Sequence, residues 1–272
     1  HLSSSKWWNF GRKQGGLFLF TPTVTADNSD WYRGTADAMY QNIDFLKRRH
    51  EPYVIISSGD CVYKLDFNRV LDFHIEKKSD ITVVCKDMMY NDDVSRFGVV
   101  RMDDESRITE FDEKPIEASS NTISTGIYVI RRRQLIELLE AAAEENRFDF
   151  VNDILVRYKN VKKIYGYKIN SYWNNIADID AYFKTNMDFL RPDIRSYFFR
   201  EEPTICSKVD DLPPAKFNPG SDISNSLVSS GCIVNGTIEN SILFKKIYIG
   251  NNSVVKLSLI HISEPTRRVV IS

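Results

Sequence analysis

The carboxyl-terminal part of the chain carries a short-period repeat of aliphatic residues that limits how it can fold. Its aliphatic side chains recur about every five to six residues and are separated by Ser, Asn and Gly. Helical spacing cannot produce this pattern, whereas a parallel β-helix turns through small or Asn-containing corners and buries one aliphatic side chain per face of each coil. We predict a β-helix of hexapeptide repeats over residues 221–260, with an ordinary β-meander as the alternative. The repeating positions are Ile223, Val228, Ile233, Ile238, Leu243, Ile249 and Val254.

Before this repeat, residues 17–189 alternate between short strand-like runs and longer stretches with helical spacing. This alternation is typical of an α/β fold. Apolar runs predict buried strands at 53–56, 81–84, 97–100 and 127–130. Helices are predicted where apolar residues share one face: one through Met39, Ile43 and Leu46, one from Leu135, and one over 178–190. We therefore assign residues 1–190 to an α/β domain.

A proline-rich stretch separates the α/β part from the repeat. Residues 191–220 contain Pro192, Pro203, Pro213, Pro214 and Pro219. Prolines remove backbone donors that helix interiors and central strands need, so we expect a linker here. The final stretch, 261–272, abandons the repeat, and we interpret it as a non-native tail. Because the sequence also begins without Met, we interpret the chain as truncated at both ends.

The charge balance and the cysteines exclude several classes of protein. The 36 basic and 37 acidic residues leave a net charge of −1 and form no basic block, so a nucleic-acid partner is not expected. No apolar run approaches the ~20 residues of a membrane span. Cys61, Cys85, Cys206 and Cys232 form no C-x-x-C pair, which favours free thiols in a reducing cytoplasm over a zinc site or disulfides.

Residues 57–60, with the sequence SSGD, directly follow the predicted strand at 53–56. In open α/β sheets, ligands bind at the carboxyl ends of the strands. Magnesium prefers one or two carboxylates together with phosphate oxygens, so Asp60 is a candidate Mg²⁺ ligand in nucleotidyl chemistry. The alternative is a Gly-Asp turn without a ligand.

Two further segments carry residues suited to phosphate binding. WYRGTADA, residues 31–38, opens the first helix, with Thr35 as the predicted N-cap and Gly34 allowing close backbone approach; helix N-termini attract phosphate. EFDEKP, residues 110–115, ends a strand and projects Lys114 into a loop, where its ammonium can neutralise a sugar phosphate. A solvated run of charges is the alternative for this second segment.

Taken together, these segments resemble the ADP-glucose pyrophosphorylase (glucose-1-phosphate adenylyltransferase) family. The matching pieces, from Trp31 to about Leu259, are WYRGTADA, ISSGDCVYKLDF, RFGVV, EFDEKP, STGIYVI, FDF, SYWNNIADIDAY and SLVSSGCIVNGTIENSILF. The resemblance implies a Rossmann-like nucleotidyltransferase domain followed by a left-handed parallel β-helix. It also implies a magnesium-dependent reaction that converts ATP and glucose 1-phosphate into ADP-glucose and pyrophosphate.

The resemblance also assigns roles to individual residues. It makes Asp60 the metal-binding carboxylate and Lys114 the contact to the phosphate of glucose 1-phosphate. The implied sugar pocket consists of Glu113, Ser124, Asp149 and Trp173, and the residues implied to lie near the nucleotide are Tyr32, Gly34, Thr35 and Gly59. No covalent intermediate is needed, because the sugar phosphate attacks the α-phosphorus in line while cations absorb the charge.

The sequence departs from the active members of that family at the reacting side of the site. Asn175 stands where they carry a second metal-binding carboxylate, and an amide brings no charge, so a two-carboxylate clamp is lost. Further departures are Asn174 for Arg, Ala177 for Gly, Val151 and Asn152 for Gly-Lys, and Cys61 for His. No Gly-rich phosphate loop precedes Trp31, so we expect no catalysis from this chain as it stands.

These departures predict a regulatory, GlgD-type subunit of bacterial glycogen synthesis, which binds better than it reacts. The resemblance implies a cytoplasmic heterotetramer with a catalytic homologue. The alternatives are a catalytic sugar-phosphate nucleotidyltransferase, including one for another sugar such as mannose 1-phosphate, and a pseudoenzyme that senses a metabolite. A hexapeptide acyltransferase would need an exposed catalytic His, for which the sequence offers only His261 near the repeat.

Overall fold

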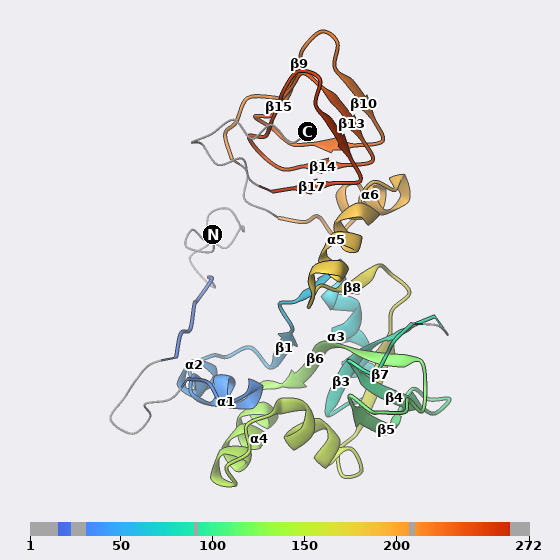
Figure 1. Ribbon diagram of the computed structural model, residues 1–272. Helices are drawn as coiled ribbons and strands as arrows, with labels where there is room; N and C mark the ends of the chain where they lie inside the picture. The colour runs from blue at the N-terminus through green and yellow to red at the C-terminus, as the bar shows by residue number, and fades with distance from the viewer. Residues whose placement is uncertain (1–15, 23–30, 90–91, 207–209, 262–272) are drawn as a thin grey trace. The chain divides into compact units, whose positions relative to one another are not determined.

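The computed structural model describes residues 16–22, 31–89, 92–206 and 210–261 (Figure 1). The chain divides into two compact units. We call Phe18–Gly59 with Leu65–Ser171 the sheet unit, and Asp60–Lys64 with the chain from Tyr172 onward the repeat unit. The short segment that contains Asp60 is thus grouped with the carboxyl-terminal part of the chain. The tail predicted at 261–272 lies, after His261, outside the described residues.

A six-stranded mixed sheet forms the sheet unit, with the order β5-β4-β6-β3-β7 and with β1 also paired to β6. The strands are β1 (Tyr53–Ser57), β3 (Ile81–Asp87), β4 (Gly98–Met102), β5 (Ile108–Glu113), β6 (Thr122–Arg131) and β7 (Ile164–Lys168). The four predicted strands are confirmed as β1, β3, β4 and β6. One expectation is wrong: β1 is only partly buried, with Ile55 41% exposed, because its described pairing is to β6 alone.

The helices of the sheet unit are α1 (Thr35–Tyr40), α2 (Ile43–Lys47), α3 (Phe67–Glu76), α4 (Arg132–Glu144) and a π-helix (Val151–Val156). The first predicted helix is interrupted by a turn between α1 and α2. At this turn the Asn42 amide donates to the carbonyl of Ala38 and to the Tyr32 hydroxyl. Met39, Ile43 and Leu46 nevertheless pack against the core, so the predicted apolar face is confirmed.

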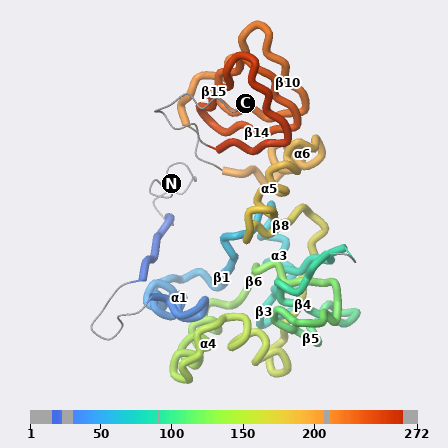
Figure 2. Tube along the Cα trace, viewed as in Figure 1, coloured from blue at the N-terminus to red at the C-terminus, as the bar shows by residue number. Residues whose placement is uncertain are grey.

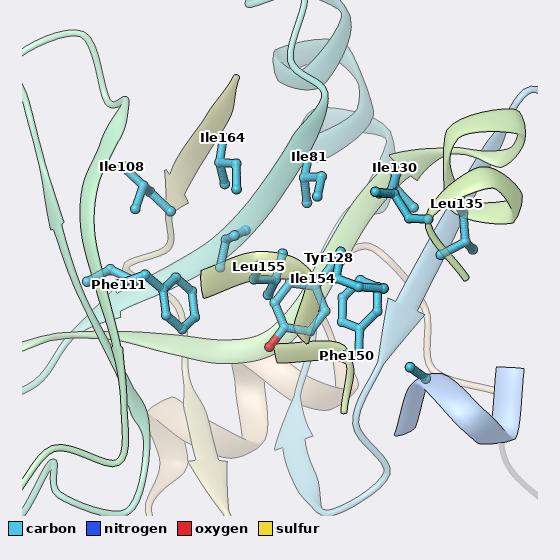
Figure 3. Packing of buried hydrophobic residues seen from close by; sticks show 14 of the residues in the cluster. Ile81, Ile108, Phe111, Tyr128, Ile130, Leu135, Phe150, Ile154, Leu155 and Ile164 are labelled. Atoms are coloured by element: carbon cyan, nitrogen blue, oxygen red, sulfur yellow. The ribbon is translucent and has the colours of Figure 1, made fainter. Parts of the chain in front are cut away.

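The core of the sheet unit lies between the sheet, α4 and the π-helix (Figure 3). Because strand residues alternate between faces, Ile81, Val83 and Cys85 of β3 join this core, while Thr82 faces α3 on the other side. Leu135 of α4 and Ile154 of the π-helix are fully buried in it. Burying each such aliphatic side chain contributes roughly 1.5–3 kcal/mol, so this core stabilises the unit to which Glu113, Lys114, Ser124 and Asp149 belong.

The repeat unit begins with a two-stranded antiparallel ribbon and two helices. The ribbon pairs β2 (Cys61–Tyr63) with β8 (Trp173–Asn175), and the helices are α5 (Ile179–Asp188) and α6 (Pro192–Phe199). The predicted helix over 178–190 is confirmed as α5, which begins where Asp178 Oδ1 accepts a hydrogen bond of 2.7 Å from Ala181 N. The prolines do not exclude a helix at 192–199, because Pro192 occupies the first turn of α6, where no N–H is needed.

A parallel β-helix follows, with three faces (Figures 1 and 2). The face sheets are β9-β12-β15 (Lys216–Phe217, Ile233–Val234, Tyr248–Ile249), β10-β13-β16 (Asp222–Ser224, Thr237–Glu239, Val254–Lys256) and β11-β14-β17 (Leu227–Val228, Ile242–Leu243, Leu259–Ile260). Every pairing in these sheets is parallel, which excludes the β-meander and fits the predicted left-handed β-helix. Corner residues Asn225 and Asn240 adopt positive φ and are joined by a hydrogen bond of 2.7 Å.

Two of the predicted inward positions of the repeat are wrong. Ile233 is 40% exposed and Val254 is 53% exposed, whereas the following residues, Val234 and Val255, are 0% and 5% exposed inside the β-helix. Both errors occur where two aliphatic residues are adjacent. Since successive strand residues point to opposite faces, only one member of each pair is buried, and composition does not identify which one.

Within the described ranges, no helix combines the length and the apolar character that crossing a bilayer requires. The four cysteines are free thiols, with Cys85 and Cys232 buried and Cys206 exposed.

His74 in α3 is a buried titratable group that stabilises the fold only when it is neutral. It is 1% exposed, its Nδ1 lies 2.8 Å from Thr82 Oγ1, and its Nε2 has no hydrogen-bond partner among the described residues. Burial, and secondarily the charge of Arg131, lowers the pKa of His74 from 6.5 to about 4, against the opposing effect of Asp80. Protonation of this ring therefore opposes folding.

The free energy of unfolding should consequently depend on pH through His74. The unfolded chain binds the proton with a pKa near 6.5, so the contribution of His74 is complete above about pH 6.5 and is lost as the pH falls toward about 4. We expect a loss on the order of 2–4 kcal/mol, measured by urea denaturation at a series of pH values. His74→Leu should flatten this dependence, while His50→Leu, which changes an exposed histidine, should leave it in place. An unchanged slope in His74→Leu would contradict the assignment.

Candidate functional site

Asp60 and Asn175 lie at the same end of the β2–β8 ribbon. Cys61 is the register partner of Asn175, and Tyr63 is that of Trp173. The amide of Ile176 donates a hydrogen bond of 2.8 Å to the carbonyl of Asp60, which extends the ribbon by one residue. The two residues that the family resemblance pairs are therefore neighbours in one unit, and the Asp60 side chain is exposed.

The side chain of Asn175 is occupied by contacts within the ribbon. Its Oδ1 accepts a hydrogen bond of 3.0 Å from the backbone N–H of Ala177, and its Nδ2 lies 3.7 Å from the Cys61 sulfur. The backbone donor fixes the orientation of the amide, because an N–H can be accepted by the oxygen and not by the NH₂ group. The oxygen, which is the only side-chain atom of Asn175 suited to Mg²⁺, therefore already accepts one hydrogen bond.

Cys61 lies between Asp60 and Asn175. Its thiol donates to Asp60 Oδ1 at 3.5 Å, while the Asn175 amide approaches its sulfur from the other side. Burial is the main cause that raises the pKa of Cys61 to about 12, and the negative charge of Asp60 acts in the same direction. The thiol stays protonated at neutral pH and serves as a neutral bridge between the two side chains.

Lys114 and Glu113 lie at the end of β5 in the sheet unit, as the EFDEKP motif predicts. Lys114 adopts a positive φ of 49° and its N–H donates to the carbonyl of Phe97 at 3.1 Å, which turns the chain out of the sheet. The Lys114 ammonium is mostly exposed and lies 3.9 Å from a carboxylate oxygen of Glu113. Burial, assisted by the charge of Asp149, raises the pKa of Glu113, although Lys114 opposes the shift.

A glycine makes room for the Glu113 carboxylate. Gly98 of β4 is the register partner of Glu113, and a Cβ at Gly98 would lie 2.9 Å both from Glu113 Oε2 and from the Phe111 ring. The RFGVV motif thus has a steric explanation: only glycine lets the carboxylate lie flat against β4. This motif therefore makes room for the side chain of Glu113.

Ser124 and Asp149 have local partners in the sheet unit. The Ser124 hydroxyl is 7% exposed and lies 3.3 Å from the Tyr128 hydroxyl. Asp149 Oδ1 accepts a hydrogen bond of 2.7 Å from Asn152 N in the first turn of the π-helix. One oxygen of Asp149 is therefore used to hold the chain, a role that its residue type does not predict.

The WYRGTADA segment packs against the FDF segment. The Phe148 carbonyl accepts hydrogen bonds from Ala36 N and Asp37 N, at 2.8 and 3.2 Å, and the Thr35 hydroxyl accepts one from Phe150 N at 2.9 Å. Gly34 is the N-cap of α1, so the prediction that Thr35 is the N-cap is wrong. The close approach predicted at Gly34 does occur, but to Phe148: a Cβ on Gly34 would lie 2.3 Å from its oxygen.

Comparison with known proteins places these motifs in a family. The model for nucleotidyl transferases matches residues 10–191, and that for the GlmU-like carboxyl-terminal hexapeptide region matches residues 213–266. Glucose-1-phosphate adenylyltransferases from Pseudothermotoga lettingae, Clostridium novyi and Clostridium beijerinckii are 36%, 35% and 37% identical to the chain. The alignments cover 94%, 94% and 95% of this chain, and 61%, 67% and 68% of the respective relatives.

This chain belongs to the glucose-1-phosphate adenylyltransferase family. It combines the Rossmann-like nucleotidyltransferase domain with the hexapeptide region, as the sequence predicts. The chain spans about three fifths to two thirds of the length of the curated relatives named above.

The predicted site residues of this glucose-1-phosphate adenylyltransferase relative are divided between its two units. Asp60, Trp173 and Asn175 belong to the repeat unit, and Trp173 is buried in the ribbon. The other predicted residues belong to the sheet unit: Tyr32, Gly34, Thr35, Gly59, Glu113, Lys114, Ser124 and Asp149. Their roles toward a ligand remain predictions. Sequence reasoning missed the Phe148 carbonyl, because a backbone acceptor leaves no signal in the identity of its residue.

The ribbon offers an incomplete donor set for a divalent cation. The described residues contain no cluster of three or more His, Cys, Asp or Glu side chains that could hold a metal. Asp60 supplies one exposed carboxylate, and the Asn175 oxygen is held by Ala177. These groups fit a cation that takes most of its ligands from substrate phosphates and water, but not one clamped by two protein carboxylates.

A cavity of about 170 Å³ lies between α1 and α4 in the sheet unit. Arg33, Tyr40 and Arg147 are among its lining residues, and the Arg33 guanidinium lies 3.8 Å from the centroid of the Phe148 ring. Small-molecule sites are usually ~300–1,000 Å³, so we assign no nucleotide to this cavity.

The two glycines predicted near the nucleotide should respond differently to substitution. Gly34→Ala forces a Cβ into the Phe148 carbonyl and should lower the free energy of unfolding by about 2 kcal/mol or more. Gly59→Ala meets no atom within 4 Å and should change it by less than about 0.5 kcal/mol. Chemical denaturation of both variants measures the difference; equal stability of the two would contradict this geometry.

The raised pKa of Cys61 should make its thiol slow to react. Only the thiolate is nucleophilic, and a pKa of about 12 leaves almost none of it at pH 7.5. In the folded protein, iodoacetamide should therefore modify the exposed Cys206 well before Cys61, as peptide mass spectrometry can follow over time. Faster labelling of Cys61 than of Cys206 would show that the thiol is not held by Asp60 and Asn175.

Proposed function

We propose that this chain is the regulatory subunit of a bacterial ADP-glucose pyrophosphorylase, with weak or no catalysis of its own. The partner would be a catalytic homologue in a heterotetramer, acting in glycogen synthesis in the cytoplasm. The substrates of the assembly would be ATP and glucose 1-phosphate. The membership of the glucose-1-phosphate adenylyltransferase family supports the reaction, and the state of Asn175 supports the regulatory role.

The occupied amide of Asn175 is the observation that carries this proposal. Holding one cation between two protein carboxylates would require a second negatively charged oxygen beside Asp60. Asn175 instead supplies a neutral amide, whose oxygen accepts a hydrogen bond from Ala177 N. Cys61, between them, adds a neutral thiol and no further carboxylate. The ribbon end therefore offers Mg²⁺ one protein carboxylate instead of two.

Of the groups proposed to bind glucose 1-phosphate, Lys114, Glu113, Ser124 and Asp149 belong to the sheet unit and Trp173 to the repeat unit. Lys114 presents an exposed ammonium on a turn that its own backbone hydrogen bond to Phe97 fixes. The raised pKa of Glu113 reflects a carboxyl group that is partly withdrawn from water beside Asp149, which suits hydrogen bonding to sugar hydroxyls. We propose that Lys114 neutralises the phosphate, and that Glu113 and Ser124 orient the sugar with Asp149 and Trp173.

A divalent cation is part of the proposed chemistry, because nucleotidyltransferases generally use one. Asp60 is the residue that would hold Mg²⁺. When bound, the cation would neutralise charge on the phosphates. Tyr32, Gly34, Thr35 and Gly59 are proposed to lie near the nucleotide, although the contacts of Gly34 and Thr35 to the FDF segment also give these two residues a structural role.

A second carboxylate should raise catalysis if this proposal is correct. The complete gene product, purified alone, is assayed for ADP-glucose formation from ATP and glucose 1-phosphate with Mg²⁺, and is compared with Asn175→Asp. We expect activity near background that rises at least about ten-fold in the variant, because one aspartate oxygen can keep the Ala177 contact while the other faces Asp60.

Asn251→Asp is the matched control for that assay. It adds the same charge at an exposed residue of the repeat unit, outside the β2–β8 ribbon. This variant should stay at background. Robust activity with Asn175 in place would overturn the regulatory proposal and favour a catalytic nucleotidyltransferase. Persistent inactivity of Asn175→Asp, with glucose 1-phosphate still bound in calorimetry, would favour a metabolite-sensing pseudoenzyme.

A further inference from the structure

The β2–β8 ribbon needs support from outside its own two strands. An isolated pair of short antiparallel strands is at best marginally stable in water. Three register pairs join β2 and β8. The exposed Asp60 carboxylate at the end of such a ribbon keeps a fixed place only if other elements hold the strands.

Lys64, the residue directly after β2, is a buried lysine that ties this strand to α6. It is 5% exposed, and its ammonium donates to the carbonyls of Tyr197 and Glu201, the latter at 2.8 Å. The ammonium also lies 4.6 Å from the centroid of the Tyr197 ring. In return, the Tyr197 hydroxyl donates to the Lys64 carbonyl at 2.5 Å. The two residues therefore hold each other through both side chain and backbone.

The cost of burying the Lys64 ammonium indicates that this lysine holds β2 and the end of α6 together. Burying an ammonium is costly unless its donors are satisfied, so a buried lysine is uncommon. Here the acceptors are the Tyr197 carbonyl in the last turn of α6, where the helix dipole is negative, the Glu201 carbonyl just after this helix, and the face of the Tyr197 ring. These groups satisfy the charge only if β2 and the end of α6 keep their relative positions.

The other strand of the ribbon is held by α5. The Tyr172 hydroxyl donates to Asp188 Oδ2 at 2.8 Å, and Asn174 Nδ2 donates to the Tyr172 hydroxyl at 2.7 Å. The Tyr172 ring also packs against Phe198 of α6. Both strands are therefore attached to the two helices that lead into the β-helix, within one unit.

We propose that Lys64 is a positioning residue: by joining β2 to the end of α6, it sets the place of the Asp60 carboxylate without touching a ligand. This inference rests on the proposed role of Asp60 in binding a divalent cation. The affinity for the cation then depends on the contact between Lys64 and the end of α6, so that a change at the end of α6 reaches Asp60 through Lys64.

Hydrogen exchange tests the contact itself and does not depend on the metal. In Lys64→Met, which keeps the aliphatic stem, peptides covering residues 61–64 and 173–176 should exchange on the order of ten-fold faster. Tyr197→Phe, which removes only the hydroxyl, should show a smaller acceleration in the same peptides. Peptides of β3 in the sheet unit should not change. Unchanged exchange of the ribbon in both variants overturns the proposal.

Lys159→Met is the matched control. Lys159 is a partly buried lysine of the sheet unit whose ammonium lies 3.5 Å from the carbonyl of Phe111, and its replacement should leave exchange of the ribbon as it was. If Lys64→Met fails to fold, as circular dichroism would show, Tyr197→Phe alone decides the outcome.

Titration with Mn²⁺ alone distinguishes positioning from a purely structural role. Broadening of the Cys61 and Ile176 amide signals in NMR spectra reports the cation at Asp60. Lys64→Met should weaken the apparent affinity roughly ten-fold, as is usual for residues that orient a metal ligand, and Lys159→Met should not. An unaltered Mn²⁺ affinity in Lys64→Met overturns the positioning role. Absence of broadening in the unmodified protein would refute the proposed metal role of Asp60, while hydrogen exchange would still decide whether Lys64 holds the ribbon.

Discussion

The pairing of β6 with its neighbours is the interaction on which the sheet unit depends. β6 pairs with β1 and β4 along one edge and with β3 along the other, so it joins both ends of the sheet. Its regular path is interrupted at Gly126, which has a φ of +75°, and Gly126 O accepts a hydrogen bond of 3.0 Å from Ser58 N. A Cβ at Gly126 would lie 3.1 Å from that of Ser58. The same strand therefore forms the core and fixes where the SSGD segment leaves the sheet.

The sequence predicts the parts of the fold that bury apolar side chains in a regular pattern. The four apolar runs become strands, and α5 begins at the capping residue Asp178, because burial and capping leave signals in residue type. The sequence does not predict which of two adjacent aliphatics faces inward at Ile233 and Val254. It also misses α6, because Pro192 is disfavoured inside a helix but favoured in its first turn.

The candidate site shows the same division between what residue type reveals and what it does not. Glu113 ends β5 and Lys114 follows it, as predicted, because a motif at a strand end fixes their place in the chain. The partners of Gly34 and Asn175 were not predictable, since the Phe148 carbonyl and the Ala177 N–H are backbone groups that any residue would supply. Both contacts hold the chain locally, at Phe148 beside α1 and at Asn175 within the ribbon.

The β-helix adds a constraint on how this part of the chain can evolve. Each coil pairs only with the coils beside it, and Val234 and Val255 fill the interior while their neighbours Ile233 and Val254 face outward. Inserting one residue into a strand would exchange these faces and expose a buried valine side chain to water. Inserting a whole coil would preserve every register and every interior position. Changes in the length of such a region are therefore tolerated in steps of one complete coil, whereas smaller insertions must fall in the corners.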